Sequence, residues 1–291
     1  MMTTQMTTQW NMRFAPHIGL YSLDTPMFLH SVGSLDPVAH IDFIAGLGFA
    51  GIEDNALLLR DEASQNLIGQ ALGRHGLQMG CIAFGPELWV EPLWTRSDEA
   101  TRAQLKAELT RAAAAVARVG GRFVTVLTGR DPLMPLAMQL QGMVSNLRLL
   151  ADDAHKQGVT LLIEPLSGWD YPAMLINDFH DAYAVVKAVD HPAVRLMFDM
   201  FHLQAMNGNI LRNLDLTYDV VGMVQIADSP HRSEPGSGEI NFVTVLRHLQ
   251  AKGYTGLVEL EHGMSDPSKA GEEAALDRLR VINDQLIKKD V

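Results

Sequence analysis

The stretch "MVSNLRLLADDAHKQGVTLLIEP" (143–165) contains a helix signal and a strand signal side by side. Apolar residues first recur at helical spacing, and the short apolar run "VTLLIEP" (159–165) follows Gly158. Glycine after a periodic segment is a common sign of a helix end, because it adopts a left-handed backbone without steric cost. The stretch therefore predicts a helix that leads into a buried strand.

The same alternation extends over the chain, which has no linker, repeat or low-complexity segment. We expect strands at 17–23, 50–55, 77–84, 122–129, 159–165, 194–199, 222–228 and 256–262. Eight apolar strands separated by helical segments predict a (β/α)₈ TIM barrel, in which a parallel sheet closes into a barrel with the helices outside. A doubly wound open sheet is the weaker alternative, since no strand is followed by a G-x-G-x-x-G or Walker-type loop. We expect one barrel domain over 16–291 and a flexible N-terminal extension over 1–15.

Composition and charge narrow the class of protein. The chain has 291 residues, 47% of them hydrophobic, and a net charge of −11 from 23 basic and 34 acidic residues. Without a basic cluster, such a chain is not expected to bind nucleic acid. The sequence shows no signal-peptide pattern, and no apolar run approaches the roughly 20 residues that a membrane span needs. We therefore expect a cytoplasmic protein that binds neither membrane nor nucleic acid.

Two further features have mainly structural interpretations. The single cysteine, Cys81, lies in an apolar run and is expected to be a buried thiol in a reducing compartment, because burial suppresses the reactive thiolate. The methionine-rich segment 134–147 is compatible with a homo-oligomer interface, although packing in the core is the favoured interpretation.

Polar residues near the predicted strand ends suggest a site, because chemistry in a TIM barrel gathers at the C-terminal ends of its strands. Glu164, Asp199 and Gln225 lie at three such ends, and the last strand offers both Glu259 and Glu261. Strand alternation puts these two on the same face, so we prefer Glu261 because it lies nearer the mouth. Oxygen ligands of this kind suit Mg²⁺ or Mn²⁺ better than Zn²⁺.

Each of these residues also has a structural interpretation. Glu164 is compatible with a strand end, Asp199 with an N-cap, and Gln225 with a polar residue satisfied inside the barrel. Several uncompensated carboxylates in one barrel are costly, however, and a cation would remove that cost. Together the residues favour a metal site.

Four segments carry a family resemblance, which is strongest over 159–263. They are "LLIEPLSG", "MFDMFHLQ", "VQIADSPHRSEPGSGEINF" and "GYTGLVELEHG". These segments resemble the hydroxypyruvate isomerases, within the xylose-isomerase-like barrel superfamily of sugar isomerases and epimerases. The resemblance implies the metal ligands Glu164, Asp199, Gln225 and Glu261, with glutamine in the third place as hydroxypyruvate isomerases have it. It also implies that His202 and Arg232 contact the substrate.

The resemblance implies a metal-dependent isomerase that converts hydroxypyruvate to tartronate semialdehyde through an enediolate. Glu164 and Glu261 would be the acid/base pair, Arg232 would hold the substrate carboxylate, and His202 would donate a hydrogen bond to a substrate oxygen. The family usually has histidine where this chain has Ser233, and tends to have it at Thr125, so the exact substrate stays open.

Three alternatives remain. A ketose 3-epimerase of the same superfamily would use the same residues. The second alternative is a catalytically silent barrel that binds a sugar or keto acid. A DNA-repair endonuclease of this fold ranks far behind, because it would need many histidine ligands at strand ends that are rich in carboxylates here.

Overall fold

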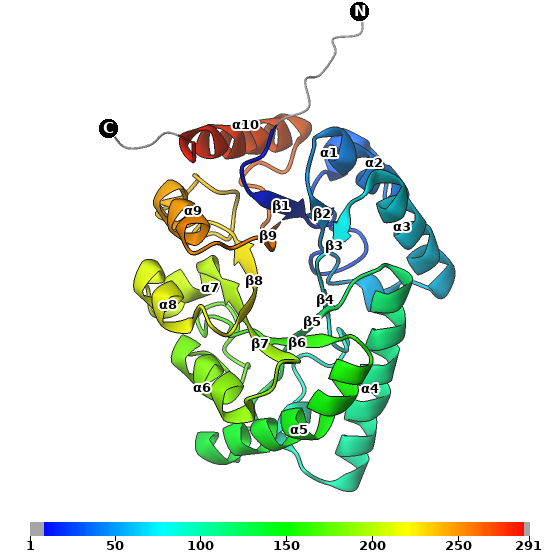
Figure 1. Ribbon diagram of the computed structural model, residues 1–291, viewed down its shortest axis with the longest axis vertical. Helices are drawn as coiled ribbons and strands as arrows, with labels where there is room; N and C mark the ends of the chain where they lie inside the picture. The colour runs from blue at the N-terminus through cyan, green and yellow to red at the C-terminus, as the bar shows by residue number, and fades with distance from the viewer. Residues whose placement is uncertain (1–8, 288–291) are drawn as a thin grey trace, which may run out of the picture.

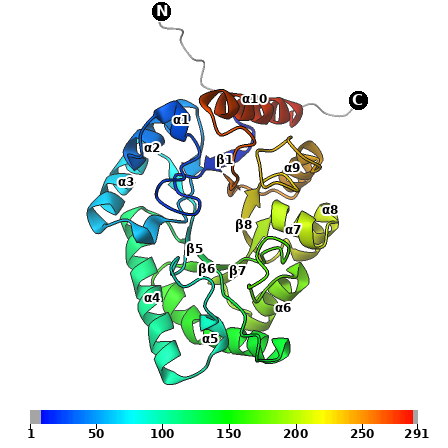
Figure 2. The same ribbon diagram turned by 180° about the vertical axis from the view of Figure 1, so that it is seen from behind.

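The computed structural model describes residues 9–287, in which short strands form an inner ring surrounded by helices (Figure 1). Figure 2 shows the same ring from behind. The strands are β1 (Arg13–Pro16), β2 (Gly51–Ile52), β3 (Gln78–Met79), β4 (Cys81–Ala83), β5 (Phe123–Val126), β6 (Thr160–Ile163), β7 (Val194–Asp199), β8 (Val221–Ile226) and β9 (Leu257–Leu260). Between residues 9 and 287 no helix is long and apolar enough to cross a membrane.

The helices follow the strands along the chain and cover the outside of the ring (Figure 1). They are α1 (Leu29–Val32), α2 (Pro37–Gly46), α3 (Glu62–His75), α4 (Glu99–Arg118), α5 (Leu136–Lys156), α6 (Phe179–Val189), α7 (Met200–Met206), α8 (Ile210–Thr217), α9 (Phe242–Ala251) and α10 (Lys269–Gln285), with 3₁₀ turns at Leu57–Leu59 and Leu93–Thr95. α5 ends and β6 begins as the opening stretch predicts, because the backbone at Gly158 is left-handed (φ 72°).

All strand pairs are parallel. Seven strands form one sheet in the order β1-β9-β8-β7-β6-β5-β4, and β2 pairs with β3 in a second. Backbone hydrogen bonds also join the neighbourhood of β2 to β1, from Ala50 N to Phe14 O and from Glu53 N to Pro16 O, both at 3.0 Å. A parallel sheet curled around an interior, with helices outside, confirms the predicted TIM-barrel class.

The structure corrects two predicted strands. The first strand is Arg13–Pro16, not 17–23, and it begins inside the range 1–15 expected to be an extension; residues 1–8 of that range fall outside the described residues. Phe14 and Ala15 are fully buried, which explains why the strand forms there. The strand predicted at 77–84 is divided at Gly80, where a Cβ atom would lie 2.0 Å from Glu259 Oε1.

Candidate active site

A group of charged side chains lies at the C-terminal ends of β6, β7 and β9. We call it the mouth cluster; it consists of Glu164, Asp199, His202, Arg232 and Glu261. Glu164 and Glu261 each follow a strand by one residue, Asp199 ends β7, His202 is on α7, and Arg232 is in the loop between β8 and α9. A cavity of about 110 Å³ is lined by Glu164, Arg232 and Glu261 together with residues of the surrounding loops.

Asp199 has two oxygens in different situations. Its Oδ1 accepts hydrogen bonds from the backbone N–H groups of Phe201 (2.7 Å) and His202 (3.1 Å), so the residue is indeed the N-cap of α7. Its Oδ2 is buried and has no hydrogen-bond partner among the described residues. Burial is the main reason that the pKa of Asp199 is raised to about 7.

Glu164 is also buried, with 6% of its surface exposed. Its Oε1 lacks a hydrogen-bond partner within the described part of the chain. Burial, followed by the charges of Glu261 and Asp199, raises the pKa of Glu164 well above its ordinary value. A second carboxylate at the mouth is therefore held without the hydrogen bonds that would stabilise its charge.

His202 is positioned as a hydrogen-bond donor. Its Nδ1 accepts a hydrogen bond from the backbone N–H of Ser167 at 3.1 Å. Burial lowers the pKa of His202 well below its ordinary value, so the ring is neutral and its one proton is assigned to Nε2. Nε2 is unpartnered among residues 9–287 and lies 3.8 Å from Asp199 Oδ2. The N–H of this ring is therefore available to a ligand.

Arg232 places a cation among these carboxylates. Its guanidinium forms an ion pair with Glu261 Oε2 and lies 3.6 Å from Asp199 Oδ2. The same group donates hydrogen bonds to the hydroxyls of Tyr171 (2.8 Å) and Tyr21 (3.4 Å). The arginine is thus fixed by two carboxylates on one side and two phenols on the other.

The loop that carries Arg232 is held by one buried carboxylate. Asp228 is 1% exposed and accepts four backbone hydrogen bonds at 2.8 to 3.0 Å. The donors are Ser229, Gly236, Gly238 and Ile240. Because these donors span the whole loop, Asp228 closes it into a compact turn. The backbone at Arg232 is left-handed (φ 52°).

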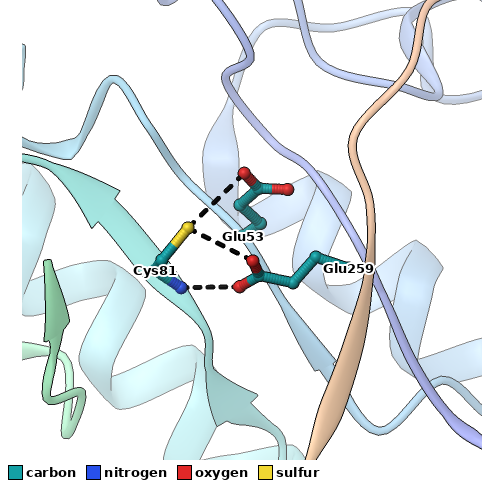
Figure 3. Close-up of side chains that lie close together, drawn as sticks. All are labelled: Glu53, Cys81 and Glu259. Atoms are coloured by element: carbon teal, nitrogen blue, oxygen red, sulfur yellow. Dashed lines mark hydrogen bonds between the residues drawn. The ribbon is translucent and has the colours of Figure 1, made fainter. Parts of the chain in front are cut away.

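A second polar group (Figure 3) is formed by the residue that directly follows β2 and by residues on β4 and β9. We call it the inner cluster; it consists of Glu53, Cys81 and Glu259, all fully buried. Glu259 accepts hydrogen bonds from Cys81 N at 2.6 Å and from Cys81 Sγ at 3.2 Å. Burial raises the pKa of Glu259 to about 8 and that of Cys81 well above its ordinary value. The prediction of a buried, non-nucleophilic thiol agrees with this environment.

Gln225 lies between the two clusters. On β8 it is in register with Asp199 of β7 and with Glu259 of β9. Its Nε2 donates a hydrogen bond to Glu53 Oε1 at 3.0 Å, while its Oε1 is buried without a hydrogen-bonding neighbour among the described residues. Gln225 is thus fixed at its nitrogen and unsatisfied at its oxygen.

The unsatisfied oxygens fit a hard cation. Glu164, Asp199 and Gln225 each have one buried oxygen for which residues 9–287 supply no hydrogen bond. Ligand atoms of Glu164, Asp199 and His202 lie within 4.8 Å of one another, as do those of the inner cluster. Buried oxygens without donors are costly and are what Mg²⁺ or Mn²⁺ binds. The structure therefore has acidic groups that are able to hold a metal ion.

The family model for the xylose isomerase-like TIM barrel matches residues 41–284. The chain belongs to this family. The match covers all the residues of the mouth cluster and of the inner cluster.

Among curated relatives, the hydroxypyruvate isomerase of Escherichia coli is 30% identical over 154 residues, which is 53% of this chain. That alignment covers 60% of the length of the relative. The 3-dehydro-D-guloside 4-epimerase of Escherichia coli is 30% identical over 240 residues, 78% of this chain and 88% of the relative. The names of these two relatives are those of an isomerase and an epimerase.

Among solved structures, an AP endonuclease of family 2 from Brucella melitensis superposes with a TM-score of 0.77. It is 24% identical and covers 89% of this chain and 96% of its own. At this identity the likeness shows the fold alone, as expected for a xylose isomerase-like barrel.

Several residues of the site were missed by sequence reasoning. Glu53 and Asn55 were detectable, because they lie at the end of the strand predicted at 50–55, where the strand-end rule applies. Tyr21 and Tyr171 line the cavity from loops, for which the sequence has no periodic signal. Of the two departures from the family pattern, Thr125 lines the cavity, whereas Ser233 forms a backbone bridge to Asp228 inside its own loop.

Proposed function

We propose that this chain is a divalent-metal-dependent isomerase that interconverts a small keto acid or ketose and its aldehyde isomer. Hydroxypyruvate and tartronate semialdehyde are the preferred pair. The observation that carries the proposal is the set of buried oxygens on Glu164, Asp199 and Gln225 without hydrogen-bond donors among the described residues. The hydroxypyruvate isomerase relative supports the reaction type.

We assign the metal to Glu164, Asp199, Gln225 and Glu261. When bound, Mg²⁺ or Mn²⁺ would polarise the substrate carbonyl and stabilise negative charge on its oxygen. The assignment takes the two sheets as one closed eight-stranded barrel, for which the hydrogen bonds between β1 and the segment around β2 give support. Glu261 is preferred to Glu259 because it lines the cavity, whereas Glu259 hydrogen-bonds Cys81 one layer deeper.

Glu164 and Glu261 both line the cavity, which supports their assignment as the acid/base pair. One carboxylate takes a C–H proton from the carbon next to the carbonyl, and the electron pair left behind forms the C=C bond of an enediolate. A proton is then returned to the former carbonyl carbon. The proton of the neighbouring hydroxyl passes to the former carbonyl oxygen, and the carbon that bore this hydroxyl becomes the new carbonyl, so the substrate isomerises without gain or loss of electrons.

Arg232 and His202 would hold the substrate. The guanidinium of Arg232 suits a carboxylate, which it binds through paired N–H groups. The free Nε2–H of His202 would donate to a substrate oxygen, in keeping with its assigned tautomer. The hydroxyls of Tyr21 and Tyr171 would keep Arg232 at the cavity wall while it exchanges Glu261 for the substrate.

Epimerisation of a ketose is the second candidate. The same carboxylates would return the proton to the carbon that lost it, on the opposite face. This candidate is supported by the 4-epimerase relative, whose alignment extends over 78% of this chain. A barrel that binds such a ligand without turnover would retain the same pocket but show no proton exchange.

Proton exchange tests the proposal directly. Metal-free protein is incubated in deuterium oxide with Mg²⁺ or Mn²⁺ and with hydroxypyruvate, small keto acids or ketoses, and each substrate is followed by NMR. We expect metal-dependent deuterium uptake together with isomerisation of hydroxypyruvate. Exchange with inversion of a ketose would favour the epimerase, and absence of exchange with every substrate would contradict both.

A further inference from the structure

One buried oxygen connects two of the proposed metal ligands. Glu53 is fully buried, and its Oε1 accepts hydrogen bonds from Asn55 Nδ2 at 2.9 Å and from Gln225 Nε2 at 3.0 Å. The second hydrogen of Asn55 Nδ2 goes to Glu261 Oε1 at 2.8 Å. Glu53 therefore reaches Gln225 directly and Glu261 through the amide of Asn55.

The contact with Glu53 determines which way the Gln225 amide faces. An amide has a donor end and an acceptor end, and the nitrogen of Gln225 is engaged by Glu53. Reversal of the amide would bring two acceptor oxygens together in a buried environment, which is unfavourable. The oxygen of Gln225 is consequently directed away from Glu53, and no described residue donates to it.

Asn55 is fixed in the same way. Its nitrogen donates to the two carboxylates, and its Oδ1 lies 3.8 Å from Cys81 Sγ. Reversal of this amide would remove both carboxylate contacts at once. Asn55 lines the cavity, so Glu261 is held from the side opposite to Arg232 by a residue whose own orientation depends on Glu53.

We propose that Glu53 is a positioning residue that orients Gln225 and, through Asn55, Glu261 for binding of a divalent metal. This inference rests on the proposed function, because it takes Gln225 and Glu261 as ligands. Residues that orient metal ligands by hydrogen bonding typically contribute about 10- to 100-fold to metal affinity. Glu53 itself need not contact the metal.

Two substitutions separate orientation from charge. Glu53→Met removes the acceptor, whereas Glu53→Gln removes the charge but keeps a carbonyl oxygen for Gln225 and Asn55. Mn²⁺ binding to metal-free protein, without substrate, is measured by electron paramagnetic resonance of the free ion. We expect Glu53→Met to lose about 10- to 100-fold in Mn²⁺ affinity and Glu53→Gln to lose much less.

A double-mutant cycle tests the route through Gln225. In a Gln225→Ala background the effect of Glu53→Met should become smaller, because one of the two oriented ligands is already absent. Asn55→Ala cuts the path to Glu261, removes one of the two amide hydrogen bonds to Glu53 Oε1 while that from Gln225 stays, and should also weaken Mn²⁺ binding. It keeps the inference testable if Glu53→Met does not fold, as judged by circular dichroism.

Asp54→Asn is the matched control. Asp54 is a neighbouring, fully buried acid that pairs with Arg60 Nε at 2.7 Å, away from the proposed ligands. Its substitution should lower the melting temperature and leave Mn²⁺ affinity unchanged. An equal loss of Mn²⁺ affinity in Asp54→Asn and Glu53→Met would mean that any substitution of a buried acid in this segment weakens metal binding. That result would overturn the inference.

The outcomes also distinguish the inference from the proposed function. Wild-type affinity in Glu53→Met, or an equal loss in Glu53→Gln and Glu53→Met, would overturn the positioning role. If Asp199→Asn and Gln225→Ala still weaken Mn²⁺ binding in that case, the proposed metal site stands without it. If the wild-type protein binds no Mn²⁺, both the site and the positioning role are wrong.

Discussion

The mouth cluster and the inner cluster are made of similar residues but differ in how their polar atoms are satisfied. In the inner cluster, both oxygens of Glu259 accept hydrogen bonds from Cys81, and Glu53 Oε2 is the one side-chain oxygen without a hydrogen-bond partner among residues 9–287. In the mouth cluster, Glu164 Oε1, Asp199 Oδ2 and His202 Nε2 find no partner among residues 9–287. Buried polar groups are normally hydrogen-bonded, so an exception needs an explanation. The difference is therefore one of degree: Glu259 and Cys81 satisfy each other, whereas three of the five mouth residues have a buried polar atom that is free for a ligand.

The positions of two glutamates along β9 and its C-terminal end produce this difference between the clusters. Glu259 and Glu261 point to the same side of the last strand, two residues apart, which is about 7 Å along its axis. At the deeper level Glu259 meets the thiol and backbone of Cys81. At the upper level Glu261 meets Arg232 and Asn55 at the cavity. Two glutamates with the same local sequence pattern thereby acquire different environments.

Substitution of these two glutamates by glutamine should give the largest difference in activity between the mouth cluster and the inner cluster. Glu261→Gln should reduce turnover by about 10²- to 10⁴-fold, the usual contribution of a general acid or base. Glu259→Gln, the matched variant in the inner cluster, should lose far less. Both are measured by deuterium exchange into hydroxypyruvate, with circular dichroism to check the fold. Full activity in Glu261→Gln with loss in Glu259→Gln would reverse the assignment.

Substitution of Arg232 should show that the mouth recognises an acid. Arg232→Ala should raise KM for acidic substrates by about 10- to 100-fold, as expected for loss of charged hydrogen bonds. A neutral ketose should be affected much less, and Arg232→Lys should lie between the two because it keeps the charge but not the paired N–H groups. Steady-state kinetics with both substrates measures this. If the substitutions change KM for the acid no more than they change KM for the ketose, a contact between Arg232 and the substrate carboxylate is excluded.

Asp228→Asn should have a smaller effect, since it acts on the mouth only through the loop of Arg232. The substituted amide would place N–H groups against backbone donors and cost about 1 to 3 kcal/mol. We expect a modest rise in KM for acidic substrates and faster hydrogen exchange of the amides in 229–240. Asp98→Asn, at the N-cap of α4, is the control and should change neither. Unaltered exchange in 229–240 would mean that Asp228 does not hold the loop.

The smallest effect is expected for the thiol of the inner cluster. Burial raises the pKa of Cys81 well above its ordinary value, so its thiolate should be scarce at neutral pH. A thiol reagent should therefore label the native protein very slowly and label one group after unfolding in urea. Rapid labelling of the native protein would show that the inner cluster opens to solvent, contrary to the comparison.

The sequence was most informative where strands are long and bury both faces. β7 lies at Val194–Asp199 as predicted, and the polar residues at the ends of β6 and β7 come together. It was least informative where a strand is short. The first strand was predicted at the wrong residues because Arg13–Pro16 has only a few apolar residues, and β2, which ends at Ile52, was predicted to extend to residue 55.

The sequence by itself determined the alternation of strands and helices, and with it the TIM-barrel class and the carboxylates at its strand ends. These features follow from local periodicity and from the ends of individual segments. Only the tertiary structure decided which polar atoms are satisfied: that Glu259 meets Cys81, that Arg232 lies between Glu261 and two tyrosines, and that Glu53 accepts a hydrogen bond from Gln225. The physical reason is that these contacts join strands and loops far apart in the chain, where residue spacing carries no information about distance.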